Sequence, residues 1–338
     1  MATVVMIILF HLVFGAMVEA VNVANNQEVI SSTEYVMSSN NKERIVGKIR
    51  YHYYKDDTTD ENHGHCTSIL ALGVGTAMSI DDYDYASHQI VLTNPTVIVI
   101  VTDSNYDDIV KTSPSKYANL LDNIYEQLHF LIPVCDYDYT GVSSPIDLFI
   151  GGHSSSGQAA LEALQGKLFH FIPAGFIGLD PFKISSDTVD YNAPLYLPSL
   201  HWGFTKTTCM VDVNEAALGA YHLFAPISDS KNKTLGRVLY LIDNEMDSRE
   251  LGHCVFTDKG CGVESIVVCP TIHPINDNWV YDALAHSIQL FLKAVEKGVA
   301  FTKDDFHLNK TFADKVFTYV NDEMVKDDKR ENTMKVTR

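Results

Sequence analysis

The sequence predicts an α/β fold in which a mostly parallel sheet is flanked by helices on both faces. The strongest β-branched run, 96–104 (TVIVIVTDS), is typical of a strand that is buried on both sides. Segments with apolar residues at helical spacing separate such runs, and strands that alternate with helices form α/β sheets. With 338 residues, of which 46% are hydrophobic, the chain can bury a large core.

The expected elements alternate along most of the chain. Ser113-Pro114 predicts a helix start, because serine caps helices and proline suits the first helical position. Residues 21–43 are polar, and we expect a loop there. Strands are expected over 44–54 (at a sheet edge), 67–75, 96–104, 146–150, 173–180, 193–200 and 237–243. Helices are expected over 81–87, from 113 onward, from the turn after 152 to about 167, over 212–221 and over 278–298.

The two ends of the chain differ from its middle. Residues 4–18 form an apolar run shorter than the roughly 20 residues that cross a bilayer, so 1–20 is expected to be a signal peptide. We expect 21–300 to form a single α/β domain with no stable membrane span, and 301–338 to be a charged, partly disordered extension. The protein is then expected to be secreted, or to reach the plastid if the leader belongs to a bipartite targeting sequence.

Charge and cysteines narrow the expected partners. A net charge of −18 argues against binding nucleic acid, which needs a basic surface. The six cysteines suit an oxidising compartment, and three of them lie within 254–269, which predicts a disulfide-stapled loop. Their spacing does not fit zinc, and no metal is expected. Asn232 and Asn309 begin N-x-T triplets that suit glycosylation of a secreted protein.

One stretch, 146–160, carries the strongest functional signal. A short apolar run leads into Gly152-His153-Ser154, and an Ala/Leu-rich segment that favours a helix follows. This matches the first half of the G-x-S-x-G turn, which lifts a nucleophilic serine above the end of a strand. Ser156 replaces the trailing glycine, and Gly157 comes one place later. We expect Ser154 to be a nucleophile and Ser156 to crowd the tightest part of the turn; the alternative is a Gly/Ser-rich turn without catalytic function.

A serine nucleophile needs a histidine to take its proton and an acid to orient that histidine. Asp180 is the best candidate acid, because it ends the strand expected after the serine's helix. Asp212, after the next strand, is its alternative. His253 is the best candidate base, since it lies between the last strand and the closing helix, and His273 in the same loop is its alternative.

Two backbone N–H groups are expected to form an oxyanion hole. One belongs to Ser155, directly after the nucleophile, and the other to Thr76, in the loop after the strand 67–75. His153 is expected to shape the turn, and His201 is expected to pack near the site.

Gly152-His153-Ser154, Gly178-Leu179-Asp180-Pro181 and Gly252-His253 occur in the order found in chlorophyllases, and the chain resembles this family from about residue 67 to 298. The resemblance implies an α/β-hydrolase fold and a catalytic triad of Ser154, Asp180 and His253. It also implies hydrolysis of a small hydrophobic ester, such as the phytyl ester of chlorophyll, through an acyl-serine and without a cofactor.

The chain departs from that family at two places near the expected site. Ser155-Ser156 stand where chlorophyllases have Arg-Gly, and Val74-Gly75 replace a His-Gly pair. The reaction class is therefore better supported than the substrate. Two alternatives follow: a general secreted esterase of the lipase or cutinase type, and a catalytically inactive hydrolase fold that serves as a secreted binding protein.

Overall fold

The computed structural model describes most of the chain between residues 18 and 325. The described residues are 18–23, 27–40, 44–55, 66–76, 78–104, 113–131, 146–181, 190, 192–206, 216–226, 235–243, 252–258, 278–309, 312 and 314–325.

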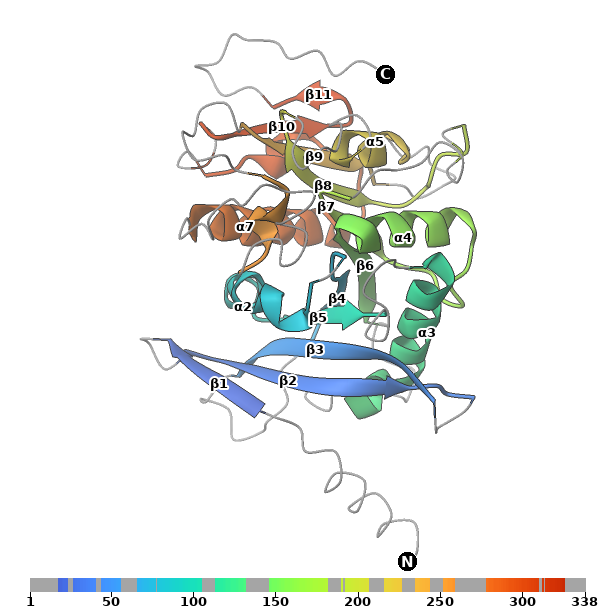
Figure 1. Cartoon of the computed structure of the whole chain (residues 1–338). Coiled ribbons are helices and arrows are strands. Elements are labelled where there is room, and N and C mark those ends of the chain that lie inside the picture. Colours follow the sequence, from blue (N-terminus) through green and yellow to red (C-terminus); the bar gives the residue numbers. More distant parts are fainter. Residues whose placement is uncertain are drawn as a thin grey trace, which may run out of the picture.

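The described strands form one sheet that runs through the whole molecule (Figure 1). Its six central strands are parallel, whereas the strands at both ends pair antiparallel. The α/β class is thus confirmed, with the parallel strands at the centre. In spatial order the strands are β1 (Val18–Val23), β2 (Gln27–Met37), β3 (Ile45–Lys55), β5 (Val97–Asp103), β4 (Ser68–Gly73), β6 (Asp147–His153), β7 (Gly175–Leu179), β8 (Ser199–Phe204), β9 (Arg237–Ile242), β10 (Val316–Val320) and β11 (Glu323–Met324).

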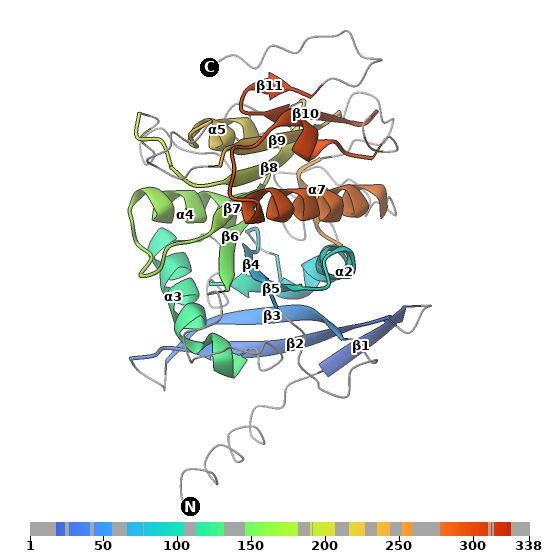
Figure 2. The same cartoon turned by 180° about the vertical axis from the view of Figure 1, so that it is seen from behind.

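Helices pack beside the parallel strands, and α7 lies along the sheet in the view from behind (Figure 2). The α-helices are α2 (Asp84–Thr93), α3 (Pro114–Leu131), α4 (Ser154–Gln165), α5 (Ala217–His222) and α7 (Asn278–Glu296), and the short 3₁₀ helices are η1 (Ile80–Tyr83), η3 (His253–Phe256) and η4 (Lys303–Phe306). The helix expected from Ser113-Pro114 is confirmed as α3.

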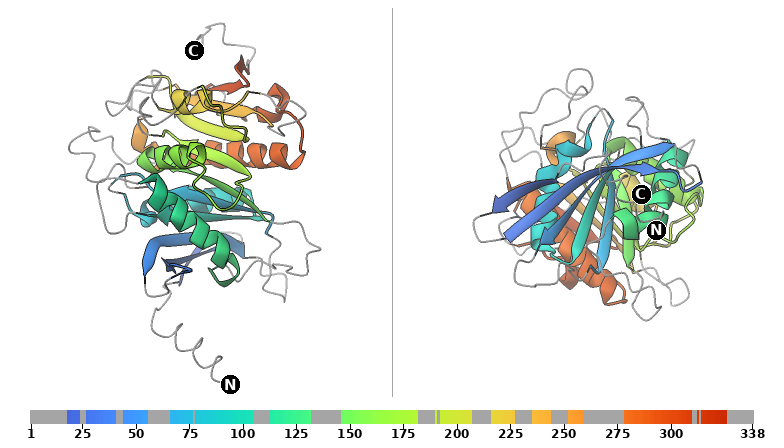
Figure 3. Two further views of the ribbon diagram at one scale, coloured as in Figure 1. Left: turned by 90° about the vertical axis from the view of Figure 1, so that its right-hand side faces the viewer. Right: turned by 90° about the horizontal axis from the view of Figure 1, so that it is seen from below.

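Two large apolar clusters hold the sheet and helices together. In β5, Val97, Val99 and Val101 belong to one cluster, whereas Ile98 and Ile100 belong to the other, as the alternation of side chains along a strand requires. The first cluster includes buried residues of α2 and α7, and the second includes those of α3 and α4. Each fully buried aliphatic side chain contributes about 1.5–3 kcal/mol to this core. Figure 3 shows the sheet from the side and from below, where the strands fan with the usual twist.

The strand expected over 44–54 is confirmed, but its predicted place at the sheet edge is wrong. The corresponding strand, β3, lies between β2 and β5 and pairs with both. We expected a polar loop over 21–43, but β2 occupies Gln27–Met37. The sequence of β2 does not alternate between apolar and polar residues, because four polar residues, 31–34, follow one another in its middle. Two of them, Ser31 and Ser32, are nevertheless buried. Ser31 is satisfied inside the protein by two histidines, so it can be buried in a strand.

The strand expected over 193–200 lies further along the chain. The observed strand, β8, covers Ser199–Phe204 and pairs with β7 and β9. Proline has no N–H group and cannot donate to a ladder. Pro194 and Pro198 therefore lie before β8, which starts directly after the second proline and pairs with a neighbour on each side.

The sheet also extends beyond the domain limits predicted at both ends. Residues 301–325, expected to be part of an extension, contribute η4, β10 and β11, and β10 pairs with β9. The cleavage point predicted after Ala20 falls within β1 (Val18–Val23). Residues 1–17 and 326–338 lie outside the described residues. Among the helices that are described, none is both long and apolar enough to cross a membrane.

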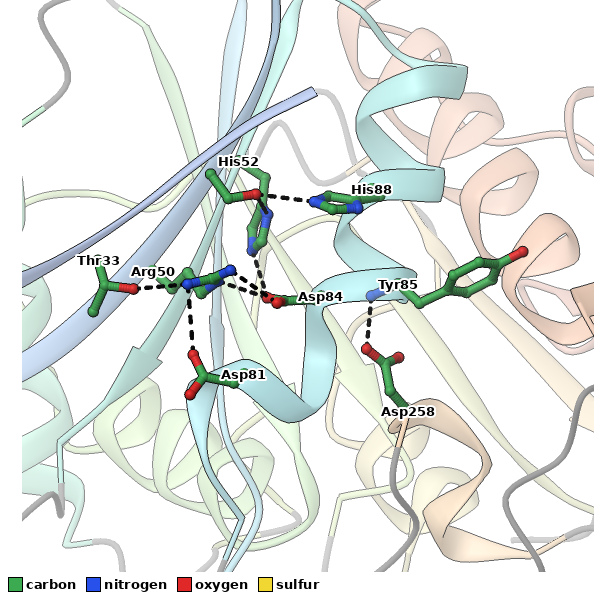
Figure 4. A network of polar contacts seen from close by, with 9 residues as sticks. Thr33, Arg50, His52, Asp81, Asp84, Tyr85, His88 and Asp258 are labelled. Carbon is green, nitrogen blue, oxygen red and sulfur yellow. Dashed lines mark hydrogen bonds and ion pairs between the residues drawn. The ribbon is translucent and has the colours of Figure 1, made fainter. Parts of the chain in front are cut away.

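An ion pair between buried Arg50 and partly exposed Asp84 joins β3 to α2 (Figure 4). The Arg50 guanidinium donates to both carboxylate oxygens of Asp84, at 2.7 and 2.9 Å, and to the Thr33 hydroxyl at 3.0 Å. Ser31 Oγ lies 2.8 Å from His52 Nδ1 and 2.9 Å from His88 Nε2. Burial lowers the pKa of both histidines, most strongly that of His52, so both are neutral at pH 7. These contacts fix α2 and η1 against the antiparallel end of the sheet.

Replacing Arg50 with methionine is expected to lower the free energy of unfolding by about 2 kcal/mol. The substitution leaves the Asp84 carboxylate without its bidentate partner, and the remaining exposure of Asp84 keeps the loss below that of a fully buried pair. Urea unfolding at pH 7 measures the change. Lys48→Met on the same strand is the matched control and is expected to stay within about 0.5 kcal/mol of wild type. Equal stabilities of the Arg50→Met variant and the wild type would contradict this account of the ion pair.

Candidate active site

Ser154 lies at the junction of β6 and α4, as the sequence motif predicts. Strand β6 ends at His153, and α4 begins at Ser154, whose backbone φ is 54°. Non-glycine residues rarely adopt this left-handed conformation, which costs on the order of 1–3 kcal/mol and is frequent at functional sites. The chain therefore turns sharply at Ser154.

Ser156 does not crowd the turn as we expected. Its hydroxyl donates a hydrogen bond to the Val74 carbonyl, and its side chain lies against Gly73 of β4. A Cβ atom at Gly73 would lie 2.5 Å from Ser156 Cβ, so the glycine makes room for the serine. The tight approach occurs at Gly157, where a Cβ atom would lie 2.7 Å from the Gly152 carbonyl oxygen. Gly157 thus fills the position where the helix comes closest to the strand.

Asp180 and His253 are in direct contact. His253 Nδ1 lies 2.7 Å from Asp180 Oδ2, and the side chains of both residues are almost completely buried. Asp180 follows β7 directly, and its φ of 40° is a second left-handed backbone conformation. The Asp180 N–H donates to the Trp202 carbonyl, which extends the pairing of β7 with β8 by one residue. A carboxylate that accepts the Nδ1 proton fixes the tautomer that leaves His253 Nε2 as an acceptor.

Among Ser154, Asp180 and His253, two buried side-chain atoms have no hydrogen-bond partner among the described residues. They are Ser154 Oγ and His253 Nε2. A buried polar atom without a partner costs about 1–3 kcal/mol, so each such atom calls for an explanation. A hydroxyl and an imidazole nitrogen are also the two groups that exchange a proton in serine hydrolases.

Hydrogen bonds to several neighbouring elements hold the η3 segment, which carries His253. The His253 carbonyl accepts a hydrogen bond from His153 Nε2 at 2.9 Å, and the Thr257 carbonyl accepts one from the Tyr281 hydroxyl at 3.0 Å. Asp258 accepts from the Tyr85 N–H at 2.7 Å, in the first turn of α2 (Figure 4). The segment is therefore attached to β6, α7 and α2 at once.

The loop after β4 lies close to Ser154. The Gly75 N–H donates to the Tyr83 hydroxyl at 2.9 Å, and that hydroxyl lies 2.8 Å from His153 Nδ1. Thr76 follows Gly75 in this loop and is partly exposed. Ser155 is the second residue of α4, so its N–H belongs to the first helical turn, whose amides suit an anion. Both expected oxyanion-hole residues thus lie next to the elbow, on α4 and on the loop after β4.

His201 is not part of this contact group. It belongs to β8, where its ring packs against Phe176, Tyr221 and Phe224. Burial and the nearby Arg237 charge lower its pKa well below the usual value, so His201 is a neutral core residue. Sequence reasoning missed Tyr83 and Asp258. Their partners are 70 and 173 residues away in the chain, and no local pattern marks them.

Several residues singled out in the sequence lie outside the described residues: Asp212, His273 and Asn232. Asn309 is described and exposed, as a glycosylated residue must be. Of the six cysteines, Cys66 and Cys254 are described, and neither is a free thiol. No cluster of three or more His, Cys, Asp or Glu side chains that could bind a metal occurs in the described ranges.

Comparison with protein-family models gives no match, and comparison with curated proteins gives none either.

Asp258 makes the anchoring of η3 dependent on pH. Burial, together with the negative charges of Asp84 and Asp82, raises the pKa of Asp258 to about 6. Because the folded pKa lies above the unfolded value, the stabilising contribution of Asp258 is complete below about pH 4 and is lost as the pH rises through about 6. Above this range, the buried charge opposes folding.

The Asp258→Asn variant is expected to melt roughly 2 °C higher than wild type at pH 7.5. The amide removes the buried charge and keeps an oxygen for the Tyr85 N–H. The difference is expected to shrink as the pH falls to 4.5, where wild-type Asp258 is protonated. Thermal unfolding of both proteins at the two pH values measures it. A variant that is less stable than wild type at pH 7.5, or a difference that does not change with pH, would contradict this assignment.

Proposed function

We propose that the protein is a serine carboxylic-ester hydrolase with an α/β-hydrolase fold, whose sheet carries helices on both faces. The 2.7 Å contact between His253 Nδ1 and Asp180 Oδ2, beside a strained Ser154, is the observation that carries this proposal. The order serine, acid, histidine along the chain also matches that fold, with the serine at a strand-to-helix turn and the acid after the next strand.

The proposed reaction begins with a proton transfer. Ser154 Oγ gives its proton to His253 Nε2 and attacks the carbonyl carbon of the ester. The two partnerless atoms become hydrogen-bonded to each other once the serine turns toward His253, since catalytic contacts often form fully only with substrate. Asp180 orients the imidazole and stabilises its protonated form.

The second half of the reaction releases both products. The Ser155 and Thr76 N–H groups stabilise the negatively charged oxygen of the tetrahedral intermediate, and His253 returns the proton to the leaving alcohol. An acyl group now occupies Ser154 Oγ. Water, deprotonated by His253, then attacks this acyl-serine. His253 gives that proton to Ser154 Oγ as the bond to the acyl group breaks, which releases the carboxylic acid and restores the free serine. The chemistry requires neither a cofactor nor a metal.

The choice of substrate rests on the sequence motifs shared with chlorophyllases. We propose a hydrophobic ester, of which the phytyl ester of chlorophyll is one candidate. Comparing the hydrolysis of chlorophyll, a long-chain triglyceride and short p-nitrophenyl esters tests this part. Preference for the triglyceride or the short esters would favour a general lipase- or cutinase-like enzyme. We also propose that the protein travels through the secretory pathway, that its clustered cysteines form disulfides, and that no nucleic acid is a partner.

Substitution of the three proposed catalytic residues tests the mechanism. Ser154→Ala and His253→Ala are each expected to lower kcat for p-nitrophenyl butyrate by at least about 10³-fold, because they remove the nucleophile or its base. Asp180→Asn is expected to cost about 10²-fold or more, because it loses the charge that stabilises the imidazolium. Steady-state kinetics on purified variants with unchanged melting temperatures measures these effects.

The alternatives left by the sequence supply matched controls. Asp212→Asn and His273→Ala are expected to keep kcat within about threefold of wild type. This is well below the tenfold change in rate that about 1.4 kcal/mol of activation free energy produces. Full activity in the Ser154→Ala variant would contradict the mechanism. Loss of activity in His273→Ala together with an active His253→Ala variant would assign the base to His273 instead. A wild-type protein without any esterase activity would favour a catalytically inactive binding protein.

A further inference from the structure

His153 lies between two parts of the proposed site that come from distant segments of the chain. Its ring is completely buried beside the His253 ring, with 4.6 Å between the centroids. On one side, Nε2 is 2.9 Å from the His253 carbonyl oxygen, and on the other, Nδ1 is 2.8 Å from the Tyr83 hydroxyl. None of these contacts is used in the proton transfers described above.

The chemistry of the partners fixes the direction of every hydrogen bond. A carbonyl oxygen can only accept, so His153 Nε2 carries the proton and donates to the His253 carbonyl. In the neutral ring, His153 Nδ1 then accepts, and the Tyr83 hydroxyl donates its single proton to it. Met78 Sδ lies 3.0 Å from the same hydroxyl but is a much weaker acceptor than the imidazole nitrogen. The same hydroxyl oxygen accepts the Gly75 N–H. Burial and the neighbouring His253 lower the pKa of His153 well below its usual value, which keeps the ring in this neutral form.

A single chain of hydrogen bonds therefore links the loop after β4 with the backbone of the residue that serves as the base. We propose that His153 and Tyr83 are positioning residues, which hold the loop after β4 and the His253 side chain in place around Ser154. The inference rests on the proposed esterase function and deepens it.

Two consequences follow for the reaction. Because Tyr83 engages the Gly75 N–H, the next amide of the loop, that of Thr76, is the donor available to the substrate oxygen. His253 becomes positively charged when it takes the serine proton, and a neutral His153 beside it adds no repulsion. The Ser156 hydroxyl, bonded to the Val74 carbonyl, holds the same loop from the elbow side. The loop is thus fixed before the substrate binds, as oxyanion holes require.

The test compares Tyr83→Phe and His153→Leu with wild type, using a fluorophosphonate to count reactive sites. Tyr83→Phe keeps the ring but removes the hydroxyl that contacts Gly75, His153 and Met78. His153→Leu removes the donor to the His253 carbonyl. Each is expected to lower kcat per labelled site about tenfold or more, with KM within about twofold, because a displaced oxyanion donor acts on the transition state. The inhibition constant of a boronic acid, which mimics the tetrahedral intermediate, is expected to rise by a similar factor.

A conservative variant and a matched control complete the test. His153→Gln can still donate from its terminal amide to the His253 carbonyl, and it is expected to recover a large part of the activity lost in His153→Leu. Tyr240→Phe also loses a buried hydroxyl, which bonds to the Phe306 carbonyl away from the site, and is expected to match wild type per labelled site.

The outcomes separate this inference from the proposed function. If wild type is labelled and hydrolyses esters while Tyr83→Phe and His153→Leu keep wild-type kcat per labelled site, the positioning role is wrong and the esterase function stands. If the two variants lower only the melting temperature or the labelled fraction, their role is structural and the inference is also wrong. A wild-type protein that is neither labelled nor active would overturn the proposed function, and the inference with it.

Discussion

The hydrogen bond between His253 Nδ1 and Asp180 Oδ2 joins residues that are 73 positions apart, and most features of the site serve this contact. Asp180 reaches it because β7 ends one residue earlier and the backbone then turns through a left-handed conformation. His253 reaches it because the η3 segment is attached to β6, α7 and α2. A buried carboxylate would be costly without such a partner, so the contact constrains both segments at once.

The parallel centre of the sheet explains why the proposed catalytic groups converge. Parallel strands end at the same edge, and β6 and β7 are neighbours there. Ser154 follows β6 directly, and Asp180 follows β7 directly. The loop after β4, the other neighbour of β6, brings Gly75 and Thr76 to the same edge. The described antiparallel strands at both ends of the sheet contribute no residue to this group. Instead, β3 holds α2 and η1 through the ion pairs of Arg50 with Asp84 and Asp81.

Much of the fold and of the site could be predicted from the sequence, because strong local patterns carry them. The β-branched run of β5, the start of α3 at Ser113-Pro114 and the strand–turn–helix around Ser154 are local signals. The structure confirms these three elements. The order of residues along the chain and the expected ends of the strands also predict that Asp180 orients His253, and the two side chains are in direct contact. Their catalytic function stays a prediction.

What could not be predicted depends on distant partners. Strand β2 is polar, and only the burial of Ser31 against His52 and His88 explains how it joins the sheet. Ser156 fits the elbow because Gly73, on another strand, leaves space for it. Tyr83 reaches His153 across 70 residues, and its own neighbours in sequence are ordinary acidic residues. None of these relations has a fixed spacing that a sequence pattern could reveal.

Ser154 is proposed to be an activated nucleophile, and covalent labelling is the direct experiment on this residue. The full chain is treated with a fluorophosphonate at neutral pH and digested, and the modified peptide is identified by mass spectrometry. We expect a single label on Ser154, strongly reduced in the His253→Ala variant, because an ordinary buried serine does not react without a base. A protein that is folded but unlabelled, or that carries its label on another serine, would show that Ser154 is not the activated nucleophile.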